Sequence, residues 1–170
     1  MINTFDGVYL DHNATTPVDP SLFEHVPSWM SQFGNPSSIH QASRGPRTLI
    51  REARAHLAAS LNVSPLELVF NSGASEGNNT IIKAIWDRRG KERPEFLCSA
   101  VEHPSAMKAM QAIQKKGATV HWIPVNKNGE LDLKFVEQHL SAKTALISVM
   151  SANNETGTLF PVANLVEMAK

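Results

Sequence analysis

The chain has 170 residues, and its 16 basic and 16 acidic side chains give a formal net charge of zero. This length suffices for one well-packed core, and the hydrophobic fraction of 42% fits a soluble α/β protein. Because no long run of either charge occurs, the composition argues against a nucleic-acid-binding or membrane-binding surface. No apolar run approaches the roughly 18 residues of a transmembrane helix, and the N-terminal residues lack the pattern of a secretory signal.

Cys98 is the only cysteine in the sequence. A single cysteine excludes an internal disulfide and fits a reducing compartment, so we expect a cytoplasmic protein. Its apolar neighbours place it inside a strand, which favours a buried small side chain over a nucleophile. The seven histidines are scattered without metal-site spacing, and we expect no metal site.

The first third of the chain has one short apolar run followed by two helical patterns. Residues 8–10 predict a strand or an extended entry that leads into a polar loop. Asp19 and Pro20 are typical of a helix start, and the apolar stripe that follows predicts a helix to Phe33, kinked at Pro27. A second helix is predicted from about residue 43 to 61.

From residue 67 onwards, predicted strands and helices alternate. The strands are expected at 67–70, 96–99, 119–123 and 144–149. The helices are expected at 75–89, at 105–116, after Asp132 and from Val162 to the end. Strands separated by helices predict a mainly parallel α/β sheet with helices on both faces.

The stretch Asn71–Asn79 joins a predicted strand to a predicted helix and is rich in small residues. The backbone N–H groups at such a helix start could hold one phosphate through Ala74 and Ser75. The glycine spacing matches neither a P-loop nor a dinucleotide-binding turn. An ordinary helix capped by Ser72 or Ser75 explains the pattern equally well.

Two further loops follow predicted parallel strands, so they are expected at the same edge of the sheet. His103, after the strand at 96–99, could stack on a planar ring or transfer protons, or it could simply bond the start of the next helix. Asn154 lies in the polar loop 153–157 after the strand at 144–149, where a plain turn is the simpler interpretation. Together with Ser75, these side chains predict a ligand-binding edge.

Five segments together resemble, in order and spacing, the N-terminal half of the nitrogen-fixation-type cysteine desulfurases. These are class V enzymes of fold-type I that use pyridoxal 5′-phosphate, and the resemblance covers essentially the whole chain. The segments are Tyr9–Pro17, Phe33–His40, Ser72–Asn79, Glu102–Pro104 and Asn153–Gly157.

The resemblance implies roles for matching residues. Ala74 and Ser75 correspond to the pair that binds the cofactor phosphate, with serine where the family usually has threonine. His103 corresponds to the histidine that stacks on the pyridine ring and assists proton transfer, and Asn154 to the asparagine on the phenolic oxygen side. A loop lining the active site corresponds to Asn13, Ala14 and Thr15.

The reaction implied by the resemblance converts L-cysteine to L-alanine and leaves an enzyme persulfide for a sulfur-acceptor protein, as in iron–sulfur cluster assembly. The Schiff-base lysine, the persulfide cysteine, and the aspartate and arginine of the active site lie beyond the matched part of the family. We therefore expect a truncated chain that is inactive alone and a homodimer in the full-length form. Residues 1–18 are expected to form an entry segment near the small domain, and residues 19–170 an incomplete large domain.

Two alternatives remain open at this stage. The chain could belong to another class V enzyme, such as an aminotransferase or a selenocysteine lyase. It could also be a non-catalytic dimerisation or interaction module, because half a sheet exposes apolar edges that favour a partner.

Overall fold

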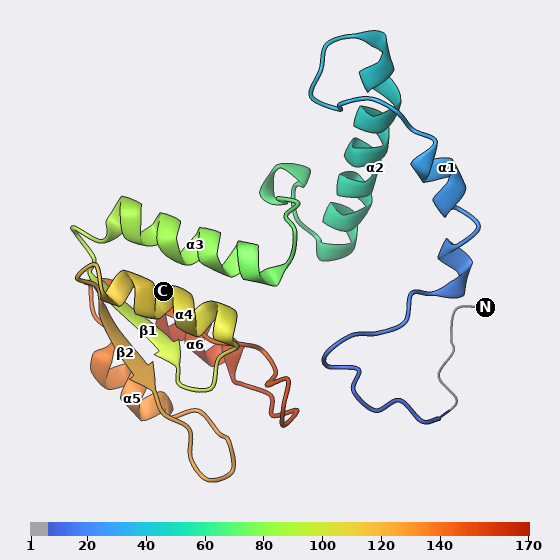
Figure 1. The fold of residues 1–170 in the computed structure, drawn as a ribbon. Coiled ribbons are helices and arrows are strands. Elements are labelled where there is room, and N and C mark those ends of the chain that lie inside the picture. Colours follow the sequence, from blue (N-terminus) through green and yellow to red (C-terminus); the bar gives the residue numbers. More distant parts are fainter. Residues whose placement is uncertain (1–6) are drawn as a thin grey trace. The chain divides into compact units, whose positions relative to one another are not determined.

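The computed structural model describes residues 7–170 (Figure 1). The described residues divide after Phe70 into two compact units. The first six positions of the predicted entry segment 1–18 lie outside the described residues. Within residues 7–170, no helix is both long enough and apolar enough to cross a membrane.

The first unit consists of helices and loops. Its α-helices are α1 (Val26–Met30) and α2 (Arg44–Leu61), and its short 3-10 helices are η1 (Pro20–Leu22), η2 (Gln41–Ser43) and η3 (Pro65–Glu67). Asp19 caps η1, as the Asp19–Pro20 pair predicts, because its carboxylate accepts a hydrogen bond of 2.9 Å from the Ser21 amide. The prediction of one kinked helix over residues 19–33 is wrong: η1 and α1 are separate. Pro27 supplies no N–H to continue a helix from the preceding turn.

Neither short apolar run of this unit forms a strand. Residues 8–10 are not in a strand, and Val8 and Leu10 are more than 80% exposed. The strand predicted at 67–70 is also wrong, because a capping box formed by Ser64 and Glu67 starts η3 instead. Within the described residues, neither run has a neighbouring strand with which to form a hydrogen-bond ladder.

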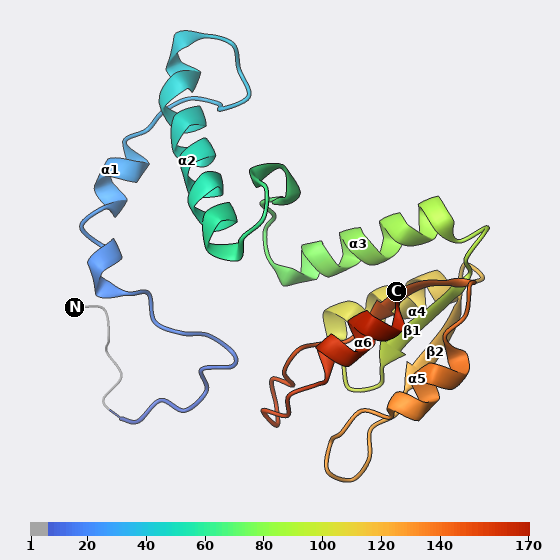
Figure 2. The same ribbon diagram turned by 180° about the vertical axis from the view of Figure 1, so that it is seen from behind.

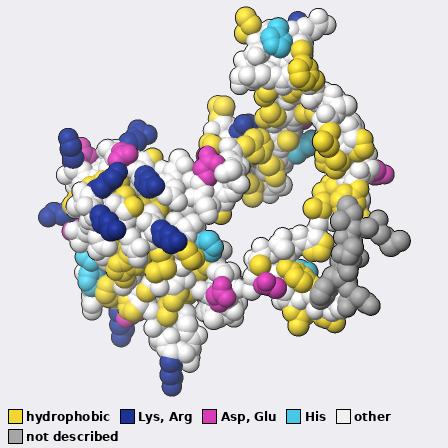
Figure 3. Space-filling model, viewed as in Figure 1, with side chains coloured by type: hydrophobic (Ala, Val, Ile, Leu, Met, Phe, Trp, Pro, Cys, Tyr) yellow, Lys and Arg dark blue, Asp and Glu magenta, His cyan; other side chains and the backbone are white. Residues whose placement is uncertain are grey.

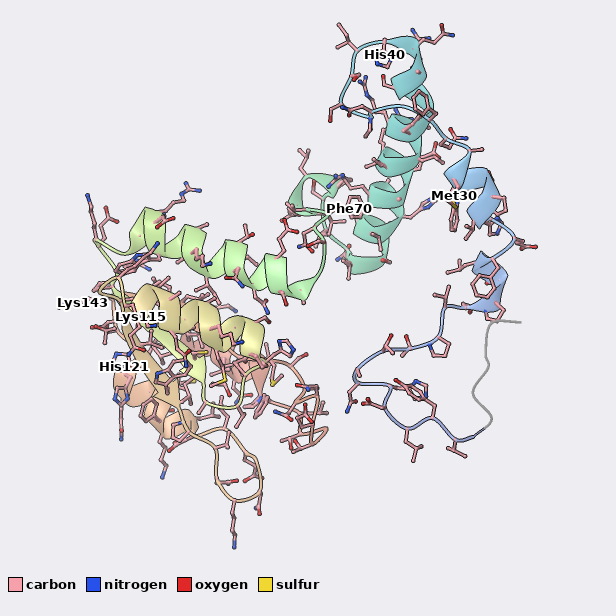
Figure 4. All side chains as sticks on the ribbon, viewed as in Figure 1. Met30, His40, Phe70, Lys115, His121 and Lys143 are labelled. Carbon is pink, nitrogen blue, oxygen red and sulfur yellow. The ribbon has the colours of Figure 1, made fainter. Side chains whose placement is uncertain are left out.

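Arginines of α2 hold the surrounding loops of the first unit. Arg47 donates from Nε to the carbonyl of Pro36 at 2.9 Å and from Nη2 to that of Ser38. Arg54 donates to the carbonyl of Leu68, and its guanidinium lies 4.7 Å from the ring centre of Phe70, which is labelled in Figure 4.

The second unit is an α/β layer structure, which confirms the predicted fold class. Its strands β1 (Glu95–Ser99), β2 (Thr119–Ile123) and β3 (Thr144–Ser148) form a parallel sheet in the order β2-β1-β3. The helices are α3 (Ala74–Arg89), α4 (Pro104–Gln114), α5 (Leu133–His139) and α6 (Val162–Met168). Asp132 caps α5, as its position predicts, by accepting from the Phe135 amide at 3.0 Å.

Helices cover both faces of the sheet. Phe96 and Cys98 of β1 point into the core shared with α3 and α4, whereas Leu97 points into the core shared with α5 and α6. Figure 1 shows α4 in front of the sheet, and the reverse view in Figure 2 shows α6 in front. Since all three side chains are fully buried, β1 is the centre of both cores.

Candidate functional site

The carboxyl ends of β1 and β3 mark the place where chain connections diverge. β1 is the central strand, and the chain leaves it for α4 on one face. The neighbouring β3 is followed by α6 on the other face. In an open parallel sheet, connections that diverge in this way leave a crevice at the carboxyl edge where ligands bind.

The start of α3 reaches this same edge. Asn78, in the second turn of α3, donates from Nδ2 to Oγ of Ser105 in α4 at 2.9 Å. Because α4 begins directly after the β1 loop, this bond fixes the N-terminus of α3 beside the carboxyl end of β1. The bond brings the first turns of α3 and α4 together, next to the residue 73–75 turn and the His103 loop.

Gly73 is the N-cap of α3, and no side chain caps the helix. The alternative of a cap by Ser72 or Ser75 is thus wrong, because the Ser72 hydroxyl and amide both donate to the Glu76 carboxylate, at 2.7 and 2.8 Å. Gly73 has φ of 149°, a conformation that favours glycine. The first N–H bonded within the helix is that of Gly77, to the Gly73 carbonyl.

The amides of Ala74, Ser75 and Glu76 consequently have no hydrogen-bond acceptor among residues 7–170. Three parallel N–H groups at the positive end of a 16-residue helix suit a phosphate. The exposed hydroxyl of Ser75 adds a fourth donor. This donor set fits the phosphate of pyridoxal phosphate, and a bound anion would satisfy groups that otherwise require water.

His103 is the N-cap residue of α4. Its Nδ1 accepts a hydrogen bond of 3.1 Å from the Ser105 amide, so the ring does bond the next helix start, as one of the two interpretations of the sequence expected. A nitrogen that accepts an N–H carries no proton, which places the ring proton on Nε2. Since the residue is exposed, the Nε2 side remains available to a ligand.

The two asparagines after β3 have different surroundings. Asn153 is 9% exposed and holds the loop together: its Nδ2 donates to the Val101 carbonyl at 3.2 Å, and its Oδ1 accepts from the amides of Glu155 and Thr156. Asn154 is exposed, and its Nδ2 donates to the Glu155 carboxylate at 2.6 Å. Asn153 therefore builds the loop, whereas the role in ligand binding predicted for Asn154 stays a prediction.

Glu102 joins the loops after β1 and β3. Its carboxylate accepts a hydrogen bond from the Met150 amide. Burial raises the pKa of Glu102 above its ordinary value of 4.5, while bonds from the Met150 and His103 amides oppose part of this rise. Glu102 therefore links the two loops at the carboxyl edge of the sheet.

We expect the stability contribution of Glu102 to fall as pH rises. The folded chain binds the Glu102 proton more tightly than the unfolded chain, so this contribution is complete below about pH 4.5 and is lost as pH passes through the higher folded pKa. The variant E102Q has no proton to release there. Urea unfolding from about pH 4 to 7 should show the stability of the unaltered chain falling relative to E102Q. If the stability of the unaltered chain minus that of E102Q stayed constant or rose with pH, this role of Glu102 would be contradicted.

Cys98 lies in the centre of the sheet. Burial, with a smaller contribution from the Glu102 charge, raises the pKa of its thiol to about 12. Because only the thiolate is a good nucleophile, this cysteine is unsuited to carry a persulfide. The interpretation of Cys98 as a buried small side chain is confirmed.

Labelling of Cys98 with an aromatic disulfide reagent is expected to be limited by unfolding. In buffer near pH 8 the thiol should react slowly, because it is both buried and protonated. The rate should rise to that of an unstructured cysteine in concentrated urea. Immediate labelling of the folded chain would show that the strand is open to solvent.

Asn13, Ala14 and Thr15 lie in an exposed turn of the first unit, where the Ala14 amide bonds the Asp11 carbonyl at 3.1 Å. The active-site role predicted for them stays a prediction. Among the described residues, no group of three or more His, Cys, Asp or Glu side chains could hold a metal ion.

Sequence reasoning missed several residues of this edge. Gly73 as the helix cap, Glu102 as a link between loops and Asn153 as a loop anchor were not assigned. A carboxylate directly after a buried strand was the signal for Glu102. The bond between Asn78 and Ser105 joins residues 27 positions apart, and no local pattern predicts such a pair.

The second unit is thus an α/β domain with an open parallel sheet and helices on both faces. A sequence profile of the class V aminotransferases matches residues 8–170. The chain therefore belongs to the class V aminotransferase family.

The chain is also similar to curated cysteine desulfurases. It is 38% identical over 164 residues to the one from Nostoc sp., and 42% identical over 173 residues to the one from Azospirillum brasilense. These matches cover 96% and 98% of this chain, but only 41% and 43% of the relatives. The chain thus spans less than half the length of the curated relatives it matches.

Solved structures agree with this assignment. A NifS-like protein superposes with a TM-score of 0.91 at 34% identity, over 96% of this chain and 45% of the other. SspA in complex with cysteine superposes with a TM-score of 0.88 at 31% identity, over 95% and 47%. The fold-type I arrangement predicted from the sequence is confirmed.

Proposed function

We propose that the chain is the N-terminal part of a pyridoxal-phosphate-dependent cysteine desulfurase. One observation carries the proposal: the three free amides of Ala74, Ser75 and Glu76 lie at the same sheet edge as His103. A site for phosphate beside an imidazole suits a phosphorylated heterocycle. The similarity to cysteine desulfurases, and to a structure containing cysteine, supports L-cysteine as the substrate.

Each residue of the site has a proposed task. The start of α3 and the Ser75 hydroxyl bind the phosphate, His103 lies against the ring and holds a proton on Nε2, and Asn154 bonds the phenolic oxygen side. When bound, pyridoxal phosphate supplies an electron-withdrawing ring that stabilises negative charge developed on an amino-acid substrate. The apolar cores on both faces of the sheet keep these groups in fixed positions.

We propose that the 170 residues alone do not turn over L-cysteine. Their only cysteine is Cys98, whose protonated and buried thiol cannot accept sulfur from a substrate. The expected result is neither alanine nor sulfide above background when the purified chain is incubated with pyridoxal phosphate and L-cysteine. Alanine released in proportion to the amount of chain would contradict the proposal.

A chimera tests the activity of the longer protein. We would join residues 1–170 to the part of the Nostoc enzyme beyond its matched segment and measure alanine formed from L-cysteine. An active chimera that loses activity with S75D supports the proposal. A folded, cofactor-loaded chimera without activity on L-cysteine, but with transaminase or selenocysteine lyase activity, would favour the other class V enzymes.

The surface of the first unit favours a homodimer. Phe33, Ile39 and Leu66 are each about 90% exposed or more, and Figure 3 shows hydrophobic side chains along α1 and α2. Exposed apolar groups at this density are typical of an interface. Light scattering on the 170-residue chain tests this surface. A monodisperse dimer would support a dimerisation surface, whereas a monodisperse monomer would contradict it.

The remaining assignments follow from the same proposal. Residues 1–18 would form the entry segment of the small domain, with Asn13, Ala14 and Thr15 lining the active site, and residues 19–170 would belong to the large domain. A sulfur-acceptor protein would receive the persulfide sulfur, and the free Cys98 fits the reducing cytoplasm.

A further inference from the structure

We propose that Asn78 and Ser105 are positioning residues that set the proton location and orientation of the His103 ring. This inference rests on the proposed function, since it concerns what His103 presents to the cofactor. Two successive hydrogen bonds, from Asn78 to Ser105 and from Ser105 to His103, join α3, the helix proposed to hold the phosphate, to the ring that would lie against the heterocycle. A third bond joins the Ser105 amide to the same ring nitrogen. The two halves of the site are thereby held in register.

The three bonds have ordinary hydrogen-bond lengths, and their donors belong to residues that are sheltered from water. Asn78 Nδ2 lies 2.9 Å from Ser105 Oγ, which lies 2.8 Å from His103 Nδ1. The Ser105 amide lies 3.1 Å from the same Nδ1. Ser105 is 8% exposed and Asn78 is half-buried, so water competes little for these bonds.

The direction of the bonds follows from which groups can donate. The Asn78 Nδ2 group only donates, so the Ser105 oxygen accepts from it and turns its own hydrogen toward Nδ1. Nδ1 then receives the hydroxyl and the Ser105 amide, and neither bond allows a proton on that nitrogen. In the neutral ring the hydrogen is therefore on Nε2, and His103 presents a hydrogen-bond donor to the ligand at that atom.

Asn78 links the helix proposed to bind the phosphate to the helix that begins at His103. The phosphate-binding amides precede Asn78 by one helical turn on α3, while Ser105 and His103 open α4. α3 and α4 pack along their length, and this bond ties their first turns together at the ligand edge. Loss of the Asn78 amide leaves the packing of the two helices but removes the link to the ring.

Nitrogen NMR of the imidazole tests the proposal without cofactor. In the 15N-labelled 170-residue chain, His103 is expected to show the pattern of the Nε2–H tautomer. A donor to an unprotonated ring nitrogen moves its resonance upfield, so S105A and N78A should each move the Nδ1 resonance downfield. S105T keeps a hydroxyl and should restore the Nδ1 resonance to its original position. T80A changes an exposed residue on α3, the helix of Asn78, and should leave the Nδ1 resonance unmoved.

Two results would overturn the proposal: an Nδ1–H tautomer in the unaltered chain, or an unmoved Nδ1 resonance in either S105A or N78A. Amide spectra of each variant would show that it is folded. Affinity for pyridoxine 5′-phosphate, an analogue without the aldehyde, should fall about three- to tenfold in both variants. If the unaltered chain fails to bind this probe while the imidazole results stand, the proposed function fails and the positioning of His103 does not.

Discussion

Replacement of Ser75 by aspartate is expected to weaken the binding of pyridoxine 5′-phosphate about a hundredfold. The new carboxylate would lie at the start of α3, beside the amides proposed to hold the phosphate. Two like charges about 4 Å apart near a protein surface repel by roughly 4 kcal/mol, and about 3 kcal/mol already corresponds to more than a hundredfold in affinity. Isothermal titration calorimetry on S75D and the unaltered chain measures the difference.

The variant S75D separates binding from folding. An acidic residue in the first turn of a helix interacts favourably with the helix dipole, so urea unfolding should find S75D at least as stable as the unaltered chain. S75T keeps the hydroxyl and should retain the affinity within a few fold. Equal affinity of S75D and the unaltered chain would show that the phosphate binds elsewhere.

The second large effect is expected from the variant F96A. Phe96 is fully buried in the central strand and packs with α3 and α4. Removing a buried phenylalanine side chain costs about 3–5 kcal/mol, which is a large part of the stability of an ordinary domain. Urea unfolding followed by circular dichroism should show the loss, together with loss of ligand binding, because β1 carries the loop that holds His103.

Leu159 provides the matched control for F96A. It belongs to the same unit, and its side chain is 79% exposed. L159A should therefore change stability by no more than about 0.5 kcal/mol. A cost for F96A as small as that of L159A would contradict the central place of Phe96 in the core shared with α3 and α4.

Local sequence patterns were sufficient for most of the second unit. Asp132 caps a helix because its side chain needs only the amide three residues later, and β2 has the predicted bounds of residues 119–123. The alternation of strands and helices predicted the parallel sheet, since each crossover helix must cover a face. The carboxyl edge followed from that topology alone.

Other features depend on partners that sequence does not reveal. The apolar run at residues 67–70 has strand composition, but a strand forms only where a neighbouring strand completes its hydrogen bonds. The sequence allowed the Ser72 hydroxyl to cap the start of α3 by accepting from a helix amide. In the structure it donates to the Glu76 carboxylate instead. The contact of Asn78 with Ser105 depends on how two helices pack, which no local pattern contains.

An amide NMR titration of the 170-residue chain with pyridoxine 5′-phosphate, using pyridoxine without phosphate as the control, tests the phosphate site most directly. We expect the phosphate form to move the amide resonances of Ala74, Ser75 and Glu76 most, and pyridoxine at equal concentration to leave these three in place. Equal shifts with both compounds, or shifts confined to other residues, would contradict a phosphate site at the start of α3.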